Sequence, residues 1–371
     1  MKNIQFAVLL MIMSITIYGN ALEEATFEGQ LRVGYQNHDT QGTNENEVAI
    51  GLKLHYESAT YYGLQVGTTL YTTQGNGDAG FEGVPFFDKN NENYTTIAEA
   101  YLKGTFSNTQ LIIGRQSFET PFADSDDIGM VPNTFEAITL VNTDIQDTTL
   151  FFSHVQKWSG VDSDAPSEFT EVNGHKGMQI FGLTYEGLNN ITLAGWFYNL
   201  QDEVQITYLE ANYEKETPDY TYGATLQYAS QNYEVGENAY VYGAAASFGV
   251  QKIGLNTTIA YNKTDGRAAE NFFGGGPFVT NAEHNTLKEA GADGNTILYT
   301  LEWDASVVGV EDLNFVLNID GHHGARQHAH EYDFAVEYAY SETIQFSAIY
   351  SNVDDNDDSF KNLRVFANYN F

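Results

Sequence analysis

Apolar and polar residues alternate along much of this chain with a period of two. The last ten residues, 362–371, place an apolar side chain at every second position and asparagine or arginine at most positions between. Residues 48–57 and 332–340 repeat the pattern. A period of two predicts a β-strand with two unlike faces. The chain is therefore expected to be a β protein whose strands each have one apolar face.

Eighteen runs of this kind follow one another between residues 26 and 371. Most have close to the ~9–11 residues that cross a membrane as a tilted strand, and an even number of strands is usual for bacterial barrels. The predicted strands are 26–36, 47–57, 63–73, 95–106, 109–116, 134–141, 148–156, 178–186, 191–199, 204–214, 220–231, 239–249, 254–262, 296–305, 313–320, 332–340, 343–351 and 362–371.

The connections between these runs alternate in length. Long loops at one rim and tight turns at the other are typical of an outer-membrane barrel. A soluble sandwich also alternates, but its polar face normally carries many Lys and Arg, which are scarce here. The prediction is an all-β, transmembrane, antiparallel up-and-down β-barrel with long extracellular loops, short periplasmic turns and both termini at the periplasmic rim. Long connections are expected at 37–46, 74–94, 117–133, 157–177 and 263–295, and short ones at 107–108, 187–190, 250–253 and 341–342.

The start of the chain and its composition agree with this interpretation. Residues 1–21 have a short basic start, an apolar stretch too short to span a membrane, and small residues at a cleavage spacing. These features predict a secretory signal peptide followed by a barrel domain at 22–371. The absence of cysteine excludes disulfides and thiolate metal sites. The net charge of −34 argues against binding to nucleic acid or to bare anionic lipid.

Two segments are similar to a known family. The stretches IGRQSFETPFADSDDIGMVPNTFEAITL (113–140) and FFGGGPFVTN (272–281) resemble the OprD-type porins and the related major porins of epsilon-class bacteria. The resemblance implies a channel for small solutes in the outer membrane of a Gram-negative bacterium, with loop three folded inward to narrow the pore. The terminal Phe371 resembles the aromatic signature that the barrel assembly machinery reads. Related porins occur as monomers and as trimers, and a homotrimer is the state that we expect.

Charged residues on the face opposite to the apolar one are expected to line the lumen. Basic side chains of this kind fall on the first, second, fourth, fifth and last strands, which are contiguous once the barrel closes. Arg115 shares its parity with Leu111 and Ile113, so its strand also allows the opposite assignment. This pore basic sector comprises Arg32, Lys53, Lys103, Arg115 and Arg364.

Acidic residues gather elsewhere. Opposed rows of charge across a narrow lumen would create a transverse field that orients dipolar solutes and filters them by charge. The alternative is that the basic residues neutralise nearby acids such as Glu28, Glu57 and Glu99. His55 and His154 are also expected to line the lumen. The pore acidic sector comprises Glu302, Asp304, Asp320, Asp333 and Glu337, and the constriction loop adds Glu119, Asp124, Asp126 and Asp127.

Two loops carry candidate metal ligands. The loop 353–359 spaces Asp354, Asn356 and Asp358 like the start of a calcium loop, but it lacks the glycine at the sixth place and the glutamate at the twelfth. We expect a solvated acidic loop with at most loosely bound Ca, and acidic external loops bridged to lipopolysaccharide by divalent ions. An exposed histidine-rich loop offers imidazoles for Zn, Ni or Cu without a fixed geometry. Its histidines are His322, His323, His328 and His330.

These observations predict a passive porin that needs no cofactor. Small hydrophilic solutes and ions, including small nutrients, amino acids and carboxylates, would diffuse through a water-filled charged pore with a weak preference for cations. The alternative is a plugged, non-conducting barrel that acts as an adhesin or a structural scaffold. Neither G-x-S-x-G nor H-E-x-x-H occurs, and the Gly-rich run 274–277 is expected to be a bend in a long loop, so an enzyme is not expected.

Overall fold

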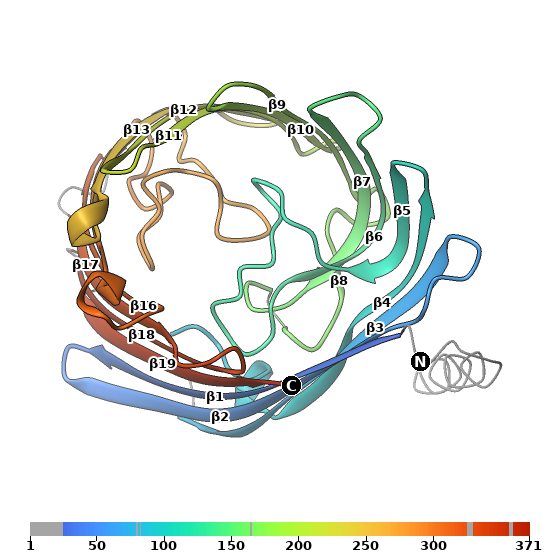
Figure 1. Cartoon of the computed structure of the whole chain (residues 1–371), viewed down its shortest axis with the longest axis horizontal. Helices are drawn as coiled ribbons and strands as arrows, with labels where there is room; N and C mark the ends of the chain where they lie inside the picture. Colours follow the sequence, from blue (N-terminus) through green and yellow to red (C-terminus); the bar gives the residue numbers. More distant parts are fainter. Residues whose placement is uncertain (1–24, 79–80, 82, 164, 325–328, 356–358) are drawn as a thin grey trace.

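The computed structural model of the chain is a closed β-barrel, and Figure 1 looks into it. The structure describes residues 25–78, 81, 83–163, 165–324, 329–355 and 359–371. The predicted signal peptide lies outside these residues and stays a prediction. None of the helices in the described ranges is long and apolar enough to cross a membrane.

The wall consists of eighteen antiparallel strands, and a nineteenth, two-residue strand (β8) pairs with the end of β7. Each wall strand pairs with its neighbours in sequence, and β1 pairs with β19 to close the ring. The strands are β1 (Thr26–Thr40), β2 (Thr43–Glu57), β3 (Leu64–Gly77), β4 (Tyr94–Phe106), β5 (Thr109–Gln116), β6 (Thr134–Asn142), β7 (Thr148–Ser159), β8 (Thr170–Glu171), β9 (Met178–Leu188), β10 (Ile191–Leu200), β11 (Val204–Glu216), β12 (Tyr220–Tyr233), β13 (Ala239–Val250), β14 (Leu255–Gly266), β15 (Asn295–Asp304), β16 (Leu313–His323), β17 (His330–Ala339), β18 (Ile344–Asp354) and β19 (Phe360–Asn370).

The eighteen predicted strands are confirmed, mostly within a few residues at each end. One connection is wrong: the predicted long loop 37–46 is instead the end of a hairpin. Here β1 continues to Thr40, and β2 begins at Thr43, so that only Gln41 and Gly42 separate them. Both have positive φ angles, 51° and 93°, which suit a tight hairpin turn. The prediction failed because both faces of this ribbon are polar beyond the membrane, and the alternation disappears while the strand persists.

The two faces of the wall have the predicted chemistry. On β1, Leu31, Val33 and Tyr35 are exposed on the outside, whereas Arg32 and Gln36 are buried inside. Outward apolar side chains continue around the ring, so the outer surface is an apolar band that a bilayer can cover without unpaired polar groups. Closure of the ring removes the free sheet edges that such a surface would otherwise expose.

Aromatic side chains fill part of the barrel interior. Phe122, from the loop after β5, packs edge-to-face on Tyr198 and Tyr208 of the wall and on Phe278 of the loop after β14. A second cluster forms where Met130 packs with wall residues near the seam between β1 and β19. The long loops are therefore part of the core, and the free lumen is narrower than the ring of strands.

The C-terminal residue lies on the seam. Phe371 exchanges two backbone hydrogen bonds with Gly29, of 2.8 and 2.9 Å, and its ring covers the space where a Gly29 side chain would lie. It also stacks on Tyr369. We therefore expect Phe371→Ala to lower the free energy of unfolding by about 1–2 kcal/mol, because roughly half a Phe ring is removed from an apolar contact.

Urea unfolding of the refolded protein in detergent micelles measures this effect without any assembly machinery. Phe346→Ala, on β18 away from the seam, controls for loss of an outward ring. A midpoint for Phe371→Ala equal to that of the wild type would show that the ring does not stabilise the closed seam.

Candidate functional site: the constriction between loops 3 and 7

Two long loops enter the barrel and meet inside it. Loop 3 (residues 117–133) and loop 7 (residues 267–294) are drawn in teal and orange within the ring of Figure 1. Ala123 and Phe273 form a parallel bridge between the loops. The amide of Asp124 donates to Phe273 O at 3.1 Å, and the amide of Phe273 donates to Phe122 O at 3.2 Å. The predicted inward fold of loop 3 is present, but loop 7 shares the constriction with it.

Glycines permit the close approach of the two loops. The amide of Gly275 donates to Asp124 Oδ1 at 3.3 Å, and a Cβ atom added at Gly274 would overlap the Asp124 carboxylate. Gly276 has a φ of 80°, which disfavours any other residue. The run at 274–277 is a bend, as expected, and it is also the surface on which a loop 3 carboxylate rests.

Arg32 of β1 holds loop 3 against the wall. Its Nη1 and Nη2 atoms donate to the two oxygens of Asp127 at 2.7 and 2.9 Å, and Nη1 also donates to Gly129 O at 2.6 Å. Nε donates to Asn368 across the seam at 3.0 Å. Bidentate pairs of this kind fix orientation as well as distance. Arg32 is therefore committed to loop 3 rather than free in the lumen.

Loop 7 is held on one side by charged residues of β17 and β19. The buried Glu331 carboxylate accepts hydrogen bonds from the amides of His284, at 3.0 Å, and Asn285, at 2.6 Å. Arg364 forms an ion pair with Glu283. Burial, followed by the charges of Arg364 and His38, lowers the pKa of His284 to about 3, so this imidazole is neutral at pH 7.

On the other side, amide side chains of β12 and β14 hold loop 7. Gln227 donates to Pro277 O at 2.7 Å and accepts from the amide of Val279 at 3.1 Å. Asn262 accepts from both the amide and the hydroxyl of Thr280. Sequence reasoning missed these residues because single amides on an inward strand face form no motif.

Three carboxylates gather where loop 3 meets loop 7. Asp124 and Asp126 come from loop 3, and Asp162 comes from the loop after β7, where Asn133 binds it at 2.6 Å. Asp126 and Asp162 share a hydrogen bond. Burial raises the pKa of Asp124 to about 6 despite the hydrogen bond from Gly275. Burial, with the charges of Asp162 and then Asp124, raises the pKa of Asp126 to about 8.

The sequence pattern singled out Asp124 and Asp126 but not Asp162, which lies in a long loop without a motif. Glu119, also predicted, accepts from the amide of Ser125 and so shapes the loop itself. Asp127 is bound by Arg32. The predicted constriction loop thus divides into two residues with structural partners and two that join the carboxylate cluster.

The pore basic sector lies inside the barrel at four of its five positions. Besides Arg32 and Arg364, Lys103 forms an ion pair with Glu57 at 2.6 Å. Lys53 lies 5.8 Å from the centre of the Tyr71 ring and makes no ion pair with any residue that the structure describes. Three of these four basic residues are therefore neutralised by a neighbouring carboxylate, which is the alternative that the sequence left open.

Arg115 is the exception, and the sequence already allowed for it. It lies opposite Ala100 and Glu136, on the parity of the exposed Ile113, and so it does not belong to the inward row. Its guanidinium approaches Glu136 at 3.5 Å and covers the Phe169 ring at 4.0 Å.

The inward assignment of His154 is also wrong. It lies on the parity of Phe152, opposite the exposed Ile138 of β6. Near the extracellular rim the strand pairing that involves β5 and β7 is irregular. There the alternation of residues along the sequence does not show which side chains face the lumen. His55, by contrast, faces inward and contacts Thr69 at 2.8 Å.

The pore acidic sector has two levels rather than one row. Asp320 and Asp333 are buried beneath loop 7, where Asp320 binds His322 at 2.8 Å and the amide of Glu331 at 2.5 Å. Glu302 binds Asn256, and Asp304 caps the short helix η4 (Ala305–Val308), both toward the periplasmic turns. Glu337 is on the same inward parity, opposite Asn314.

The candidate metal ligands that the structure describes do not converge on one point. Within the described ranges, no group of three His, Asp or Glu side chains is arranged to hold a metal ion. His322 is bound to Asp320 and Thr296. Asp354 accepts from Ser359 at 3.2 Å, whereas Asn356, Asp358 and His328 lie outside the described residues.

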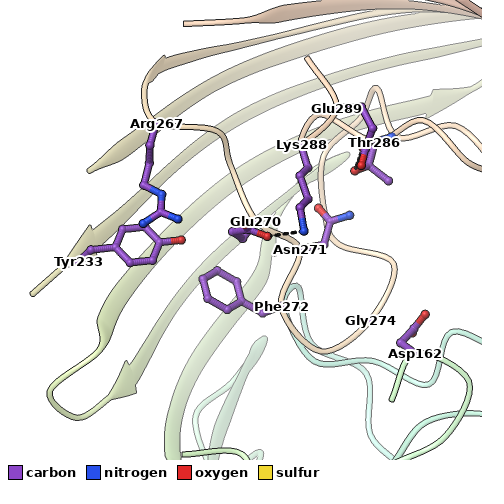
Figure 2. Close-up of a pocket in the computed structure, with 10 residues that line it drawn as sticks. All are labelled: Asp162, Tyr233, Arg267, Glu270, Asn271, Phe272, Gly274, Thr286, Lys288 and Glu289. Atoms are coloured by element: carbon purple, nitrogen blue, oxygen red, sulfur yellow. Dashed lines mark hydrogen bonds and ion pairs between the residues drawn. The ribbon is translucent and has the colours of Figure 1, made fainter. Parts of the chain in front are cut away.

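The extracellular mouth contains a depression of about 490 Å³ between loop 7 and the end of β12 (Figure 2). The Arg267 guanidinium lies 3.9 Å from the centre of the Tyr233 ring. Lys288 and Glu270 form an ion pair of 2.8 Å. Asp162 borders the same depression, which therefore leads to the carboxylate cluster of the constriction.

Known proteins share this arrangement of strands. The profile of the family described as outer membrane porin, OprD family, matches residues 20–370. OccK9 (OpdG) of Pseudomonas aeruginosa superimposes with a TM-score of 0.81 at 19% identity, covering 94% of this chain and 98% of that one. A BenF-like porin from Pseudomonas fluorescens gives 0.81 at 16% identity (94% and 99%), and OccAB4 of Acinetobacter baumannii gives 0.80 at 16% (94% and 98%). No curated protein matches the sequence significantly.

The contact at Gly274 can be tested directly. A methyl group in Gly274→Ala would push loop 3 and loop 7 apart, because the Asp124 carboxylate occupies its place. We expect a larger and noisier unitary conductance in planar bilayers. Gly236→Ala, in an extracellular loop where an added Cβ meets nothing within 4 Å, is the control. A conductance that is the same in Gly274→Ala and Gly236→Ala would show that this contact does not set the pore width.

Proposed function

Since the chain belongs to the OprD family of outer membrane porins and forms a channel for small hydrophilic solutes, we propose that its constriction favours cations and zwitterions over anions. The observation that carries this proposal is the imbalance of unpaired charge at the constriction. Three inward basic residues are neutralised by Asp127, Glu57 and Glu283. The cluster of Asp124, Asp126 and Asp162 has no basic partner among the described residues.

Confinement strengthens the effect of these charges on a passing ion. A charge that faces a narrow aqueous passage acts on every ion that passes, and low-dielectric walls strengthen it. With a pKa of about 6, Asp124 is mostly ionised at pH 7, whereas Asp126 mostly keeps its proton. The cluster therefore attracts cations at neutral pH without binding them as tightly as three full charges would.

Neutralising the cluster tests the proposal. In the double variant Asp124→Asn, Asp126→Asn, we expect the cation-to-anion permeability ratio to fall about tenfold, because one charge about 6 Å from the ion path in water stabilises a cation and destabilises an anion by ~0.7 kcal/mol each, a difference of ~1.4 kcal/mol. Reversal potentials under a KCl gradient give the ratio. Asp312→Asn, which removes a carboxylate in an exposed periplasmic turn, should leave it unchanged. An unchanged ratio in the double variant would reject the cluster as the selectivity element.

The raised pKa values predict a pH dependence. Carboxyls with pKa values of about 6 and about 8 are uncharged at pH 5 and become ionised as the pH rises to 9. Cation preference is therefore expected to increase across this window, with most of the change above the range of an ordinary aspartate. The change across this window should be smaller in the double variant, in which Asp162 is the one carboxyl of the cluster that is left. If the cation preference of the wild type reaches its final value below pH 5, the titrating groups are not Asp124 and Asp126 with raised pKa values.

The same proposal covers the role of Phe371, the state of assembly and the binding of Ca. Phe371 would serve the barrel assembly machinery, which its half-exposed ring at the periplasmic seam supports. Membership of a porin family supports a protein that is not an enzyme, and related porins make a homotrimer the expected assembly. Any Ca held by the acidic external loops would be loosely bound.

A further inference from the structure

The extracellular depression has an unused cationic group at one end. Arg267 follows β14 directly, and its guanidinium carbon lies over the Tyr233 ring, 3.9 Å from the ring centre. It forms no ion pair or side-chain hydrogen bond with the part of the chain that the structure describes. Stacking on a ring fixes the plane of a guanidinium while its N–H edge stays available for a carboxylate.

The other end of the depression is acidic. Figure 2 shows Arg267 and Tyr233 on one side, Asp162 and Glu289 on the other, and Phe272 and the Glu270–Lys288 ion pair between them. The two charges of this ion pair cancel each other. The remaining charges form a dipole across an aromatic surface.

We propose that this depression is an external binding site for small zwitterions with an apolar side group. The carboxylate lies on the N–H edge of Arg267, the ammonium group faces Asp162 and Glu289, and the side group covers Phe272. An anion alone would meet the acidic end, and a cation alone would meet Arg267. Only a molecule that carries both charges has a complementary partner at each end.

The expected affinity is low. The site is open to water, and exposed ion pairs contribute little, so a dissociation constant on the order of millimolar is appropriate. Weak binding suits a passive channel, because a solute must leave the site in order to permeate. Solutes concentrated here would be released beside Asp162, at the entrance to the constriction.

Block of single-channel current by L-phenylalanine tests the site. We expect block from the extracellular side, with weaker block by 3-phenylpropanoate, which lacks the ammonium group, and by phenethylamine, which lacks the carboxylate. In Arg267→Gln the half-blocking concentration of L-phenylalanine should rise about tenfold, the usual effect of losing a charge-assisted hydrogen bond. Arg267→Lys keeps the charge but loses the planar guanidinium and its stacking on Tyr233. Its half-blocking concentration should lie between those of the wild type and Arg267→Gln.

Two controls separate this inference from loss of fold and from the proposed charge preference. Lys252→Gln removes a positive charge from a periplasmic turn, and L-phenylalanine should block this variant as it blocks the wild type. Glu289→Gln should weaken block by L-phenylalanine but not by 3-phenylpropanoate. Equal block in Arg267→Gln and wild type, or equal block by all three compounds, would overturn the site. Reversal potentials of the same variants report the charge preference of the constriction independently.

Discussion

Irregular backbone inside the barrel must find hydrogen-bond partners on the wall, and the rest of the structure depends on how it does so. Loops 3 and 7 cross the interior without regular structure, and an unpaired buried backbone group costs about 1–3 kcal/mol. Glu331, Gln227 and Asn262 meet this demand from three different strands. Arg32 does so for loop 3 through Gly129 O. The inward polar residues are therefore first of all the supports of the constriction.

Because the inward charged residues bind the loops, they contribute less to the electric field in the lumen than their number indicates. A basic residue that holds a loop carboxylate contributes little net field to the lumen, as the pairs of Arg32 and Arg364 illustrate. At the constriction itself, the loop cluster of Asp124, Asp126 and Asp162 is what remains without a basic partner among the described residues. A pore can consequently have a continuous basic sector on its wall and still favour cations. Counting inward charges strand by strand does not capture this, because the partners come from loops.

The strands were predictable from the sequence because lipid and water impose opposite demands on alternate residues, and that alternation is local. Beyond the membrane the demand disappears, and the continuation of β1 to Thr40 was missed for that reason. Arg115 was ambiguous because its strand is short and twisted at Gly114, whose φ is 126°. The site was only half predictable. Asp124 and Asp126 lie in a stretch with a recognisable pattern, whereas Asp162 joins them through three-dimensional packing alone.

On the proposed route a solute meets the mouth before the constriction, and the charges of the two places are arranged differently. At the mouth, Arg267 lies on one side of Phe272 and the Glu270–Lys288 ion pair, and Asp162 and Glu289 lie on the other, so a dipolar molecule would be oriented rather than sorted by net charge. At the constriction, burial first and the neighbouring carboxylates second raise the pKa of Asp126, and this weakens the field that the cluster exerts at neutral pH. A full set of three negative charges would hold a cation in the pore, whereas a partly protonated cluster attracts it and lets it leave. The raised pKa values of Asp126 and Asp162 are thus expected to limit the depth of the electrostatic well at this level of the pore.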